Sequence, residues 1–153
     1  MGSTGKIEVE VEIKSPASKF WESIRDSTNL FPKIFPEQYK SIEVVEGDGK
    51  SVGTIKLLKY AEGMPLITFS KEKIEAVDET TKSVSYSIID GELVNFYKNF
   101  KANLNVGTKG EGSLVKWSCE FEKASEEIPD PNIIKDFAVK SFQDLDAYIL
   151  TKA

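Results

Sequence analysis

The stretch DPNIIKDFAVKSFQDLDAYILTK, residues 130–152, decides the fold. Asp130 is expected to cap a helix whose first position is Pro131, where the missing N–H costs nothing. The apolar residues recur at the three- and four-residue spacing of an amphipathic helix: Ile133, Ile134, Phe137, Ala138, Phe142, Leu145 and Ile149. The opposite, polar face carries Lys135, Asp136, Lys140, Gln143, Asp144 and Asp146. Such a long stripe needs a broad apolar partner surface.

The chain before this helix has mostly the pattern of β-strands. Residues 6–14, KIEVEVEIK, alternate apolar and acidic side chains, which is typical of a strand with one wet face. Two short helices follow: one begins at Ser15-Pro16, and one covers about residues 27–33 and is stopped by Pro32 and Pro36. The remaining apolar runs, joined by short Gly-rich or acidic links, predict further strands at 39–45, 53–60, 66–77, 82–90, 93–106 and 113–123.

Short links make neighbouring strands antiparallel, and Asp90-Gly91 is typical of a tight hairpin. We therefore expect one α+β domain over residues 1–153, in which a strongly curved antiparallel sheet wraps around the C-terminal helix. There is no internal repeat, linker or low-complexity segment.

Composition excludes several classes of function. The chain of 153 residues has a net charge of −5 and a single arginine, Arg25, which argues against nucleic acid as a partner. It has no histidine and one cysteine, Cys119, so we expect no metal, no cofactor and no histidine-based catalysis. The sequence shows no signal peptide and no apolar run long enough to span a membrane, so we expect no membrane insertion and a reducing, cytoplasmic location.

Alternation along the strands predicts which side chains face the helix. The inward set is rich in aromatic residues, yet it includes Tyr60, Tyr86, Lys98, Cys119 and, from the helix, Ser141. An apolar cavity with a few polar groups needs this mixture, whereas a solid core with tyrosines bonded to the backbone is the alternative. By this alternation, no acidic side chain faces inward beside Lys98.

One loop and two single residues each allow a structural explanation as well as a functional one. Residues 47–53, GDGKSVG, lack the first glycine and the following helix of a phosphate-binding loop, so they predict a hairpin loop. Lys98, if it faced an apolar cavity, would have a lowered pKa and could act as a base or nucleophile; the alternative is that it reaches solvent. Cys119 is expected to be a small buried residue, because no neighbouring base is evident.

The segments KIEVEVEIKSPASKFWE, DSTNLFPKIFPEQYKSIEVVEGDGKSVGTIKLLKYAEG, YSIIDGELVNFYKNFKANLNV and SLVKWSCEFEKASEEIPDPNIIKDFAVKSFQDLDAYIL resemble the plant major latex protein-like family, a branch of the Bet v 1 and pathogenesis-related class 10 superfamily. The resemblance covers nearly the whole chain. It implies the helix-grip fold: a seven-stranded curved antiparallel sheet, two short helices after the first strand, and a large hydrophobic cavity beneath the long helix. It also implies that residues 47–53 are the family's glycine-rich loop.

The resemblance further implies a protein that binds, transports or stores hydrophobic small molecules, such as phenolic or sterol-like compounds, in plant defence or stress responses. Combined with the parity above, it gives a set of candidate ligand-binding residues and no catalytic ones: Leu30, Phe31, Leu58, Tyr60, Phe69, Tyr86, Ile88, Lys98, Phe100, Leu104, Trp117, Cys119, Phe137, Ala138, Ser141 and Phe142.

Two alternatives stay open. The superfamily includes norcoclaurine synthase, so the chain could be an isomerase or condensing enzyme that uses Lys98 and a tyrosine such as Tyr86. It also includes hormone receptors whose loops close over a ligand and dock a protein partner, although their gate sequences are not recognisable in residues 47–53 or 62–65. A monomer is expected, because the sequence leaves no large apolar face without a partner.

Overall fold

The computed structural model describes residues 4–62 and 67–152. One long helix lies against a seven-stranded antiparallel sheet whose strand order is β1-β7-β6-β5-β4-β3-β2. The elements in chain order are β1 (Thr4–Ile13), α1 (Ala17–Arg25), α2 (Ser27–Ile34), β2 (Tyr39–Glu46), β3 (Ile55–Tyr60), β4 (Phe69–Asp78), β5 (Ser83–Gly91), α3 (Leu93–Phe96), β6 (Tyr97–Lys109), β7 (Gly112–Lys123) and α4 (Asn132–Thr151).

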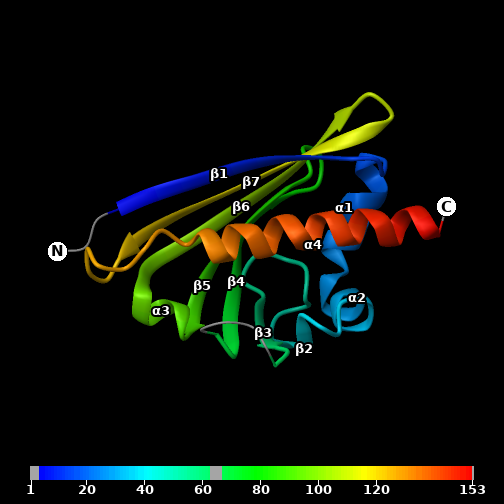
Figure 1. Ribbon diagram of the computed structural model, residues 1–153. Helices are drawn as coiled ribbons and strands as arrows, with labels where there is room; N and C mark the ends of the chain where they lie inside the picture. Colours follow the sequence, from blue (N-terminus) through cyan, green and yellow to red (C-terminus); the bar gives the residue numbers. More distant parts are fainter. Residues whose placement is uncertain (1–3, 63–66, 153) are drawn as a thin grey trace.

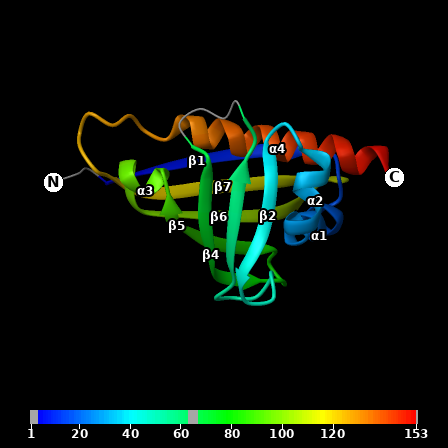
Figure 2. The ribbon, with the colours of Figure 1, turned by 90° about the horizontal axis from the view of Figure 1, so that it is seen from below.

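The sheet is strongly curved. Figure 1 shows α4 lying along its inner side, with α1 and α2 near the C-terminal end of α4. Seen from below, β2 and β4 run across the direction of the long strands β6 and β7 (Figure 2). The helix-grip architecture expected from the sequence is therefore confirmed.

Strands β1 and β7 follow their alternating patterns closely. Their register pairs Val9 with Trp117 and Val11 with Val115 on the inner face, and Trp117 and Val115 are buried. The glutamates at alternate positions of β1 remain exposed, as their spacing predicts. The inner face of this half of the sheet thus follows from parity alone.

The connection between β5 and β6 differs from the predicted hairpin. The two strands do pair in antiparallel fashion, but the short helix α3 stands between them, where the sequence pattern indicated a strand from residue 93. Gly91 has φ +113°, and a Cβ there would lie 2.4 Å from the carbonyl oxygen of Phe69. The glycine therefore permits close backbone approach rather than a two-residue turn.

Three smaller expectations about where helices and strands begin or end are wrong. Pro32 lies inside α2 instead of stopping it, and only Pro36 comes after the helix. Pro131 takes the cap position of α4 with no side-chain cap, because the Asp130 carboxylate pairs with Lys123 at 2.8 Å. The predicted strand from residue 66 begins in the structure at Phe69, and residue 66 itself lies outside the described residues.

Asp146 was expected on the wet face of α4, and this is also wrong, since it is buried. Its carboxylate accepts hydrogen bonds from the backbone N–H groups of Ser15 at 2.8 Å and Lys14 at 3.1 Å, and from the Ser15 hydroxyl. These bonds satisfy donors in the link from β1 to α1 that would otherwise be buried without partners. They fix the C-terminal half of α4 to the start of the chain.

Residues 47–53 form the loop between β2 and β3, as predicted. The Asp48 carboxylate accepts hydrogen bonds from the backbone N–H groups of Lys50 at 2.8 Å and Ser51 at 2.7 Å. Gly47 has φ +89°, and a Cβ there would lie 2.9 Å from the Thr54 Cα. The loop uses its own carboxylate to satisfy its amides, so its local structure needs no phosphate.

Candidate functional site

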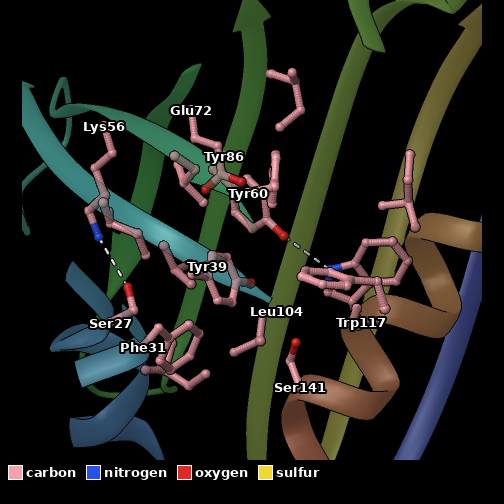
Figure 3. A pocket seen from close by; sticks show the side chains of 18 of the residues that line it. Ser27, Phe31, Tyr39, Lys56, Tyr60, Glu72, Tyr86, Leu104, Trp117 and Ser141 are labelled. Atoms are coloured by element: carbon pink, nitrogen blue, oxygen red, sulfur yellow. Dashed lines mark hydrogen bonds between the residues drawn. The ribbon is translucent and has the colours of Figure 1, made fainter. Parts of the chain in front are cut away.

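A cavity of about 170 Å³ lies between the inner face of the sheet and the N-terminal half of α4. A single water molecule needs about a tenth of that volume, so there is room for a small organic ligand. The wall is formed by strands β2 to β7, by α1 and α2 at one end, and by residues 133–142 of α4. Figure 3 shows how the labelled side chains converge on it from these elements.

Aromatic rings make one continuous part of the wall. The ring centroid of Tyr39 lies 5.7 Å from that of Phe31, 5.9 Å from Tyr60 and 5.5 Å from Phe137. The rings of Tyr60 and Phe137 are edge-to-face at 6.1 Å. Such pairs stabilise one another beyond their burial, and they join α2, β2, β3 and α4 at this side of the cavity.

Besides Arg25 of α1, which pairs with Glu79, two charged side chains line the cavity, Lys56 from β3 and Glu72 from β4. They are cross-strand neighbours, but in the part of the chain that the structure describes they are not in ion-pair contact. Lys56 Nζ instead donates to the Ser27 hydroxyl at 3.3 Å, as Figure 3 shows. The wall therefore offers a cation and an acid that remain separate.

Burial changes the acidity of these groups. It raises the pKa of Glu72 to about 7, although the positive charge of Lys56 opposes the rise. It lowers the pKa of Lys56, while the charge of Glu72 works in the other direction. Burial also raises the pKa of Tyr60 and of Tyr86, so both phenols stay protonated at neutral pH. The cavity is an apolar medium that disfavours charge.

Two hydrogen bonds orient further polar groups of the wall. The Trp117 indole N–H donates to the Tyr86 hydroxyl oxygen at 3.2 Å. The Ser141 hydroxyl donates to the Gln38 side-chain oxygen at 3.3 Å. Both pairs connect elements far apart in sequence, and they fix the directions in which Tyr86 and Ser141 present their polar atoms.

The structure brings together twelve of the sixteen residues that the sequence indicated as ligand-binding. These twelve line the cavity: Phe31, Leu58, Tyr60, Tyr86, Ile88, Phe100, Leu104, Trp117, Phe137, Ala138, Ser141 and Phe142. Contact of these residues with a ligand remains a prediction.

The other four do not line the cavity, and two of them contradict the predicted parity. Lys98 is exposed, because β6 has a bulge between Lys98 and Lys101 and Asn99 adopts φ 53°. A bulge reverses the alternation beyond it. Phe69 faces away from the cavity beside exposed Lys59, because the chain bends at Thr68 before β4 begins.

Cys119 and Leu30 lie in packed parts of the molecule. Cys119 is only 1 % exposed on the inner face of β7, and burial raises the pKa of its thiol to about 11. It behaves as the small buried residue that we expected and not as a nucleophile. Leu30 of α2 is half-buried and packs against the core beside the cavity wall.

The sequence reasoning missed Glu72 and Lys56. The expectation that no acidic side chain faces the cavity is therefore wrong. A signal was present: counting by two from buried Ile74 gives Glu72, and counting by two from Leu58 gives Lys56. Placing Phe69 on the inner face puts Glu72 on the outer face by the same count of two, so the misplaced Phe69 concealed Glu72.

Residues 2–152 match the Pathogenesis-related protein Bet v 1 family. The chain is 56% identical over 150 residues to MLP-like protein 423 of Arabidopsis thaliana, an alignment that covers 98% of this chain and 97% of that protein. It superposes on the crystal structure of ginseng major latex-like protein 151 from Panax ginseng with a TM-score of 0.88 and 32% identity, covering 96% and 98% of the two chains. The chain therefore belongs to the Bet v 1 family, within its major latex protein-like branch.

A more distant structure has the same fold. Norcoclaurine synthase from Thalictrum flavum, solved with dopamine and hydroxybenzaldehyde, gives a TM-score of 0.77 at 20% identity, covering 99% of this chain and 90% of that one. This likeness concerns the fold alone. Among residues 4–62 and 67–152, no helix is both long enough and apolar enough to pass through a bilayer.

Proposed function

We propose that residues 1–153 form a single ligand-binding domain that carries or stores an apolar small molecule in the cytosol, as part of a plant defence or stress response. The observation that supports this most directly is the cavity itself, with aromatic walls and few polar groups. Membership of the Bet v 1 family, which is known for ligand binding, supports the same function.

The physical basis is burial of ligand surface. Each Å² of apolar surface removed from water stabilises a complex by about 25 cal/mol, before the cost of association is subtracted. Pockets for small molecules are usually largely pre-formed, so little reorganisation is expected to oppose binding. Polar atoms of Tyr60, Tyr86 and Ser141 then select the orientation of the ligand.

Titration with N-phenyl-1-naphthylamine, whose fluorescence rises in apolar surroundings, tests the proposal. We expect saturable binding with one probe per chain, and displacement by phenolic or sterol-like competitors. A fluorescence change that does not saturate, or that competitors do not reverse, contradicts an internal binding site. The oligomeric state, expected to be monomeric, is measured in the same samples by light scattering.

The two alternative functions, an enzyme and a ligand-gated signalling module, depend on different residues. The enzyme hypothesis built on Lys98 is not supported, because this side chain is exposed on the outer side of a bulge. The hypothesis of a ligand-gated signalling module depends partly on residues 62–65, and residues 63–65 lie outside the described residues. It predicts a protein partner captured only when the probe is bound, which a pull-down with and without probe would detect.

A further inference from the structure

Glu72 is the one acidic side chain among the described residues that line the cavity. Burial and the charge of Lys56 are what perturb it, and no described residue donates a hydrogen bond to its carboxylate. Polar groups within protein interiors normally have partners. An acid that folding leaves without one keeps its full capacity to accept a proton or a hydrogen bond from a ligand.

Tyr86 stands near Glu72 in the same wall (Figure 3). Its hydroxyl oxygen accepts the indole N–H of Trp117 at 3.2 Å. A phenol that accepts one hydrogen bond still has its own proton to donate. Because the indole occupies the side toward β7, the Tyr86 proton is available to a group inside the cavity.

The charged and titratable groups around Glu72 come from β3 and β5, which flank its own strand, and from β2. They are Lys56 and Tyr60 of β3, Tyr86 of β5 and Tyr39 of β2. Residues 133–142 of α4 contribute only uncharged side chains to the cavity. At the end of the cavity formed by α1 and α2, Arg25 is already paired with Glu79 at 3.0 Å.

We propose that Glu72 and Tyr86 form an acid–base site that removes and returns a proton beside the carbonyl group of a bound apolar ketone. The proposal rests on the carrier function above, since the ketone must first occupy the cavity. It assigns to that cavity a chemical step, enolisation, and a ligand class, ketones with an acidic C–H.

The step balances without a cofactor. The ionised Glu72 takes a proton from the carbon next to the carbonyl, and the electron pair of that C–H bond forms the enolate. Tyr86 donates its hydroxyl proton in a hydrogen bond to the enolate oxygen and so stabilises the developing charge. Glu72-COOH then returns the proton to the same carbon or, in a β,γ-unsaturated ketone, to the γ carbon, which moves the double bond.

The pKa of Glu72 suits a general base that takes up and returns a proton. Its pKa of about 7 lets it exist as a base at neutral pH and still hold the abstracted proton. General bases are most effective when their pKa lies near the working pH. A carboxylate base together with a phenol donor in an apolar pocket is a known arrangement for enolisation.

Hydrogen–deuterium exchange at C1 of 2-tetralone in D₂O, followed by proton NMR, tests the proposal. We expect saturable acceleration by the unmodified protein, with a rate that rises with pH through about 7. Glu72→Gln should lower the accelerated rate about a hundredfold and remove this pH dependence, and Tyr86→Phe should lower it about tenfold. The matched control is Glu75→Gln on the exposed side of the same strand, which should exchange at the unmodified rate.

Binding of 2-tetralone is measured in the same samples by displacement of the naphthylamine probe. Binding within threefold of the unmodified protein in Glu72→Gln, together with lost exchange, supports the acid–base site. Binding without exchange, or equal exchange in Glu72→Gln, overturns it and leaves the carrier function standing. Loss of exchange only in Lys56→Met assigns the chemistry to an imine and also overturns it. If probe and ketone both fail to bind, the carrier function falls as well.

Discussion

The two halves of α4 carry the same apolar stripe but meet different surroundings. In the C-terminal half, Phe142, Leu145 and Ile149 are buried, where the helix contacts β1 and α1. In the N-terminal half, Ile134, Phe137 and Ala138 stay partly exposed and cover the cavity. One periodic pattern thus produces a solid core at one end of the helix and a hollow at the other.

Two carboxylates show the same contrast. Asp146, in the packed half, accepts hydrogen bonds from both the backbone and the hydroxyl of Ser15, and from Lys14. Glu72, in the wall opposite the other half, receives none from the described residues. The carboxylate of the packed half is therefore satisfied within the protein, whereas the carboxylate beside the cavity can still accept a proton or a hydrogen bond from a ligand.

The largest loss of stability should come from Leu145→Ala, because Leu145 is fully buried in the packed half. We expect a loss of about 4 kcal/mol in the free energy of unfolding, measured with urea. Phe137→Ala, in the hollow half, should lose less than half as much although it removes more atoms. Equal losses would show that both halves are packed alike.

The pH dependence of stability should distinguish the hollow half through Glu72. Its pKa rises from 4.5 in the unfolded chain to about 7 in the folded one. The stabilisation from its protonated form is complete below pH 4.5 and is lost as the pH rises through about 7, which amounts to about 3 kcal/mol. Glu72→Gln should therefore gain that amount relative to the unmodified protein between pH 4.5 and 8.5, and a constant difference would contradict the shift.

Asp146→Asn tests the satisfied carboxylate of the packed half. The amide keeps one acceptor oxygen but brings an NH₂ group toward donors that it cannot satisfy. We expect a loss of about 2 kcal/mol at neutral pH in urea unfolding. Asp144→Asn, on the outer side of the same helix in a solvent-exposed pair with Lys140, is the control and should change stability by less than about 0.5 kcal/mol.

The smallest change in stability should come from Ala138→Phe, which places a ring where the cavity is. We expect less than about 1 kcal/mol of destabilisation, because the ring fills space instead of displacing packed atoms. Affinity for the naphthylamine probe should nevertheless fall at least tenfold. Ala147→Phe, which adds the same ring at an exposed position of α4, should bind the probe normally. Large destabilisation with unchanged binding would indicate a filled core.

The fold was largely predictable because regular elements repeat their pattern. Val115, Trp117 and Phe121 of β7 alternate without interruption, so parity placed each of them correctly on the inner face. The stripe of α4 was equally direct. Prediction failed where the backbone departs from regularity, at the bulge beside Asn99 and at the bend of Thr68. One irregular residue reverses the side expected for the residues beyond it, as for Lys98 when the alternation is counted back from Phe100 across the bulge.

The sequence by itself determined the order of the elements, the antiparallel sheet and the long helix that needs its concave face, because hydrophobic periodicity acts over neighbouring residues. Only the tertiary structure decided that Asp146 binds the link between β1 and α1 and that Glu72 lies in the cavity wall. Whether a carboxylate meets donors, solvent or an apolar wall depends on segments that are remote in sequence, as Ser15 is from Asp146. The same holds for the hollow itself, which is the volume left where the curved sheet and α4 do not meet.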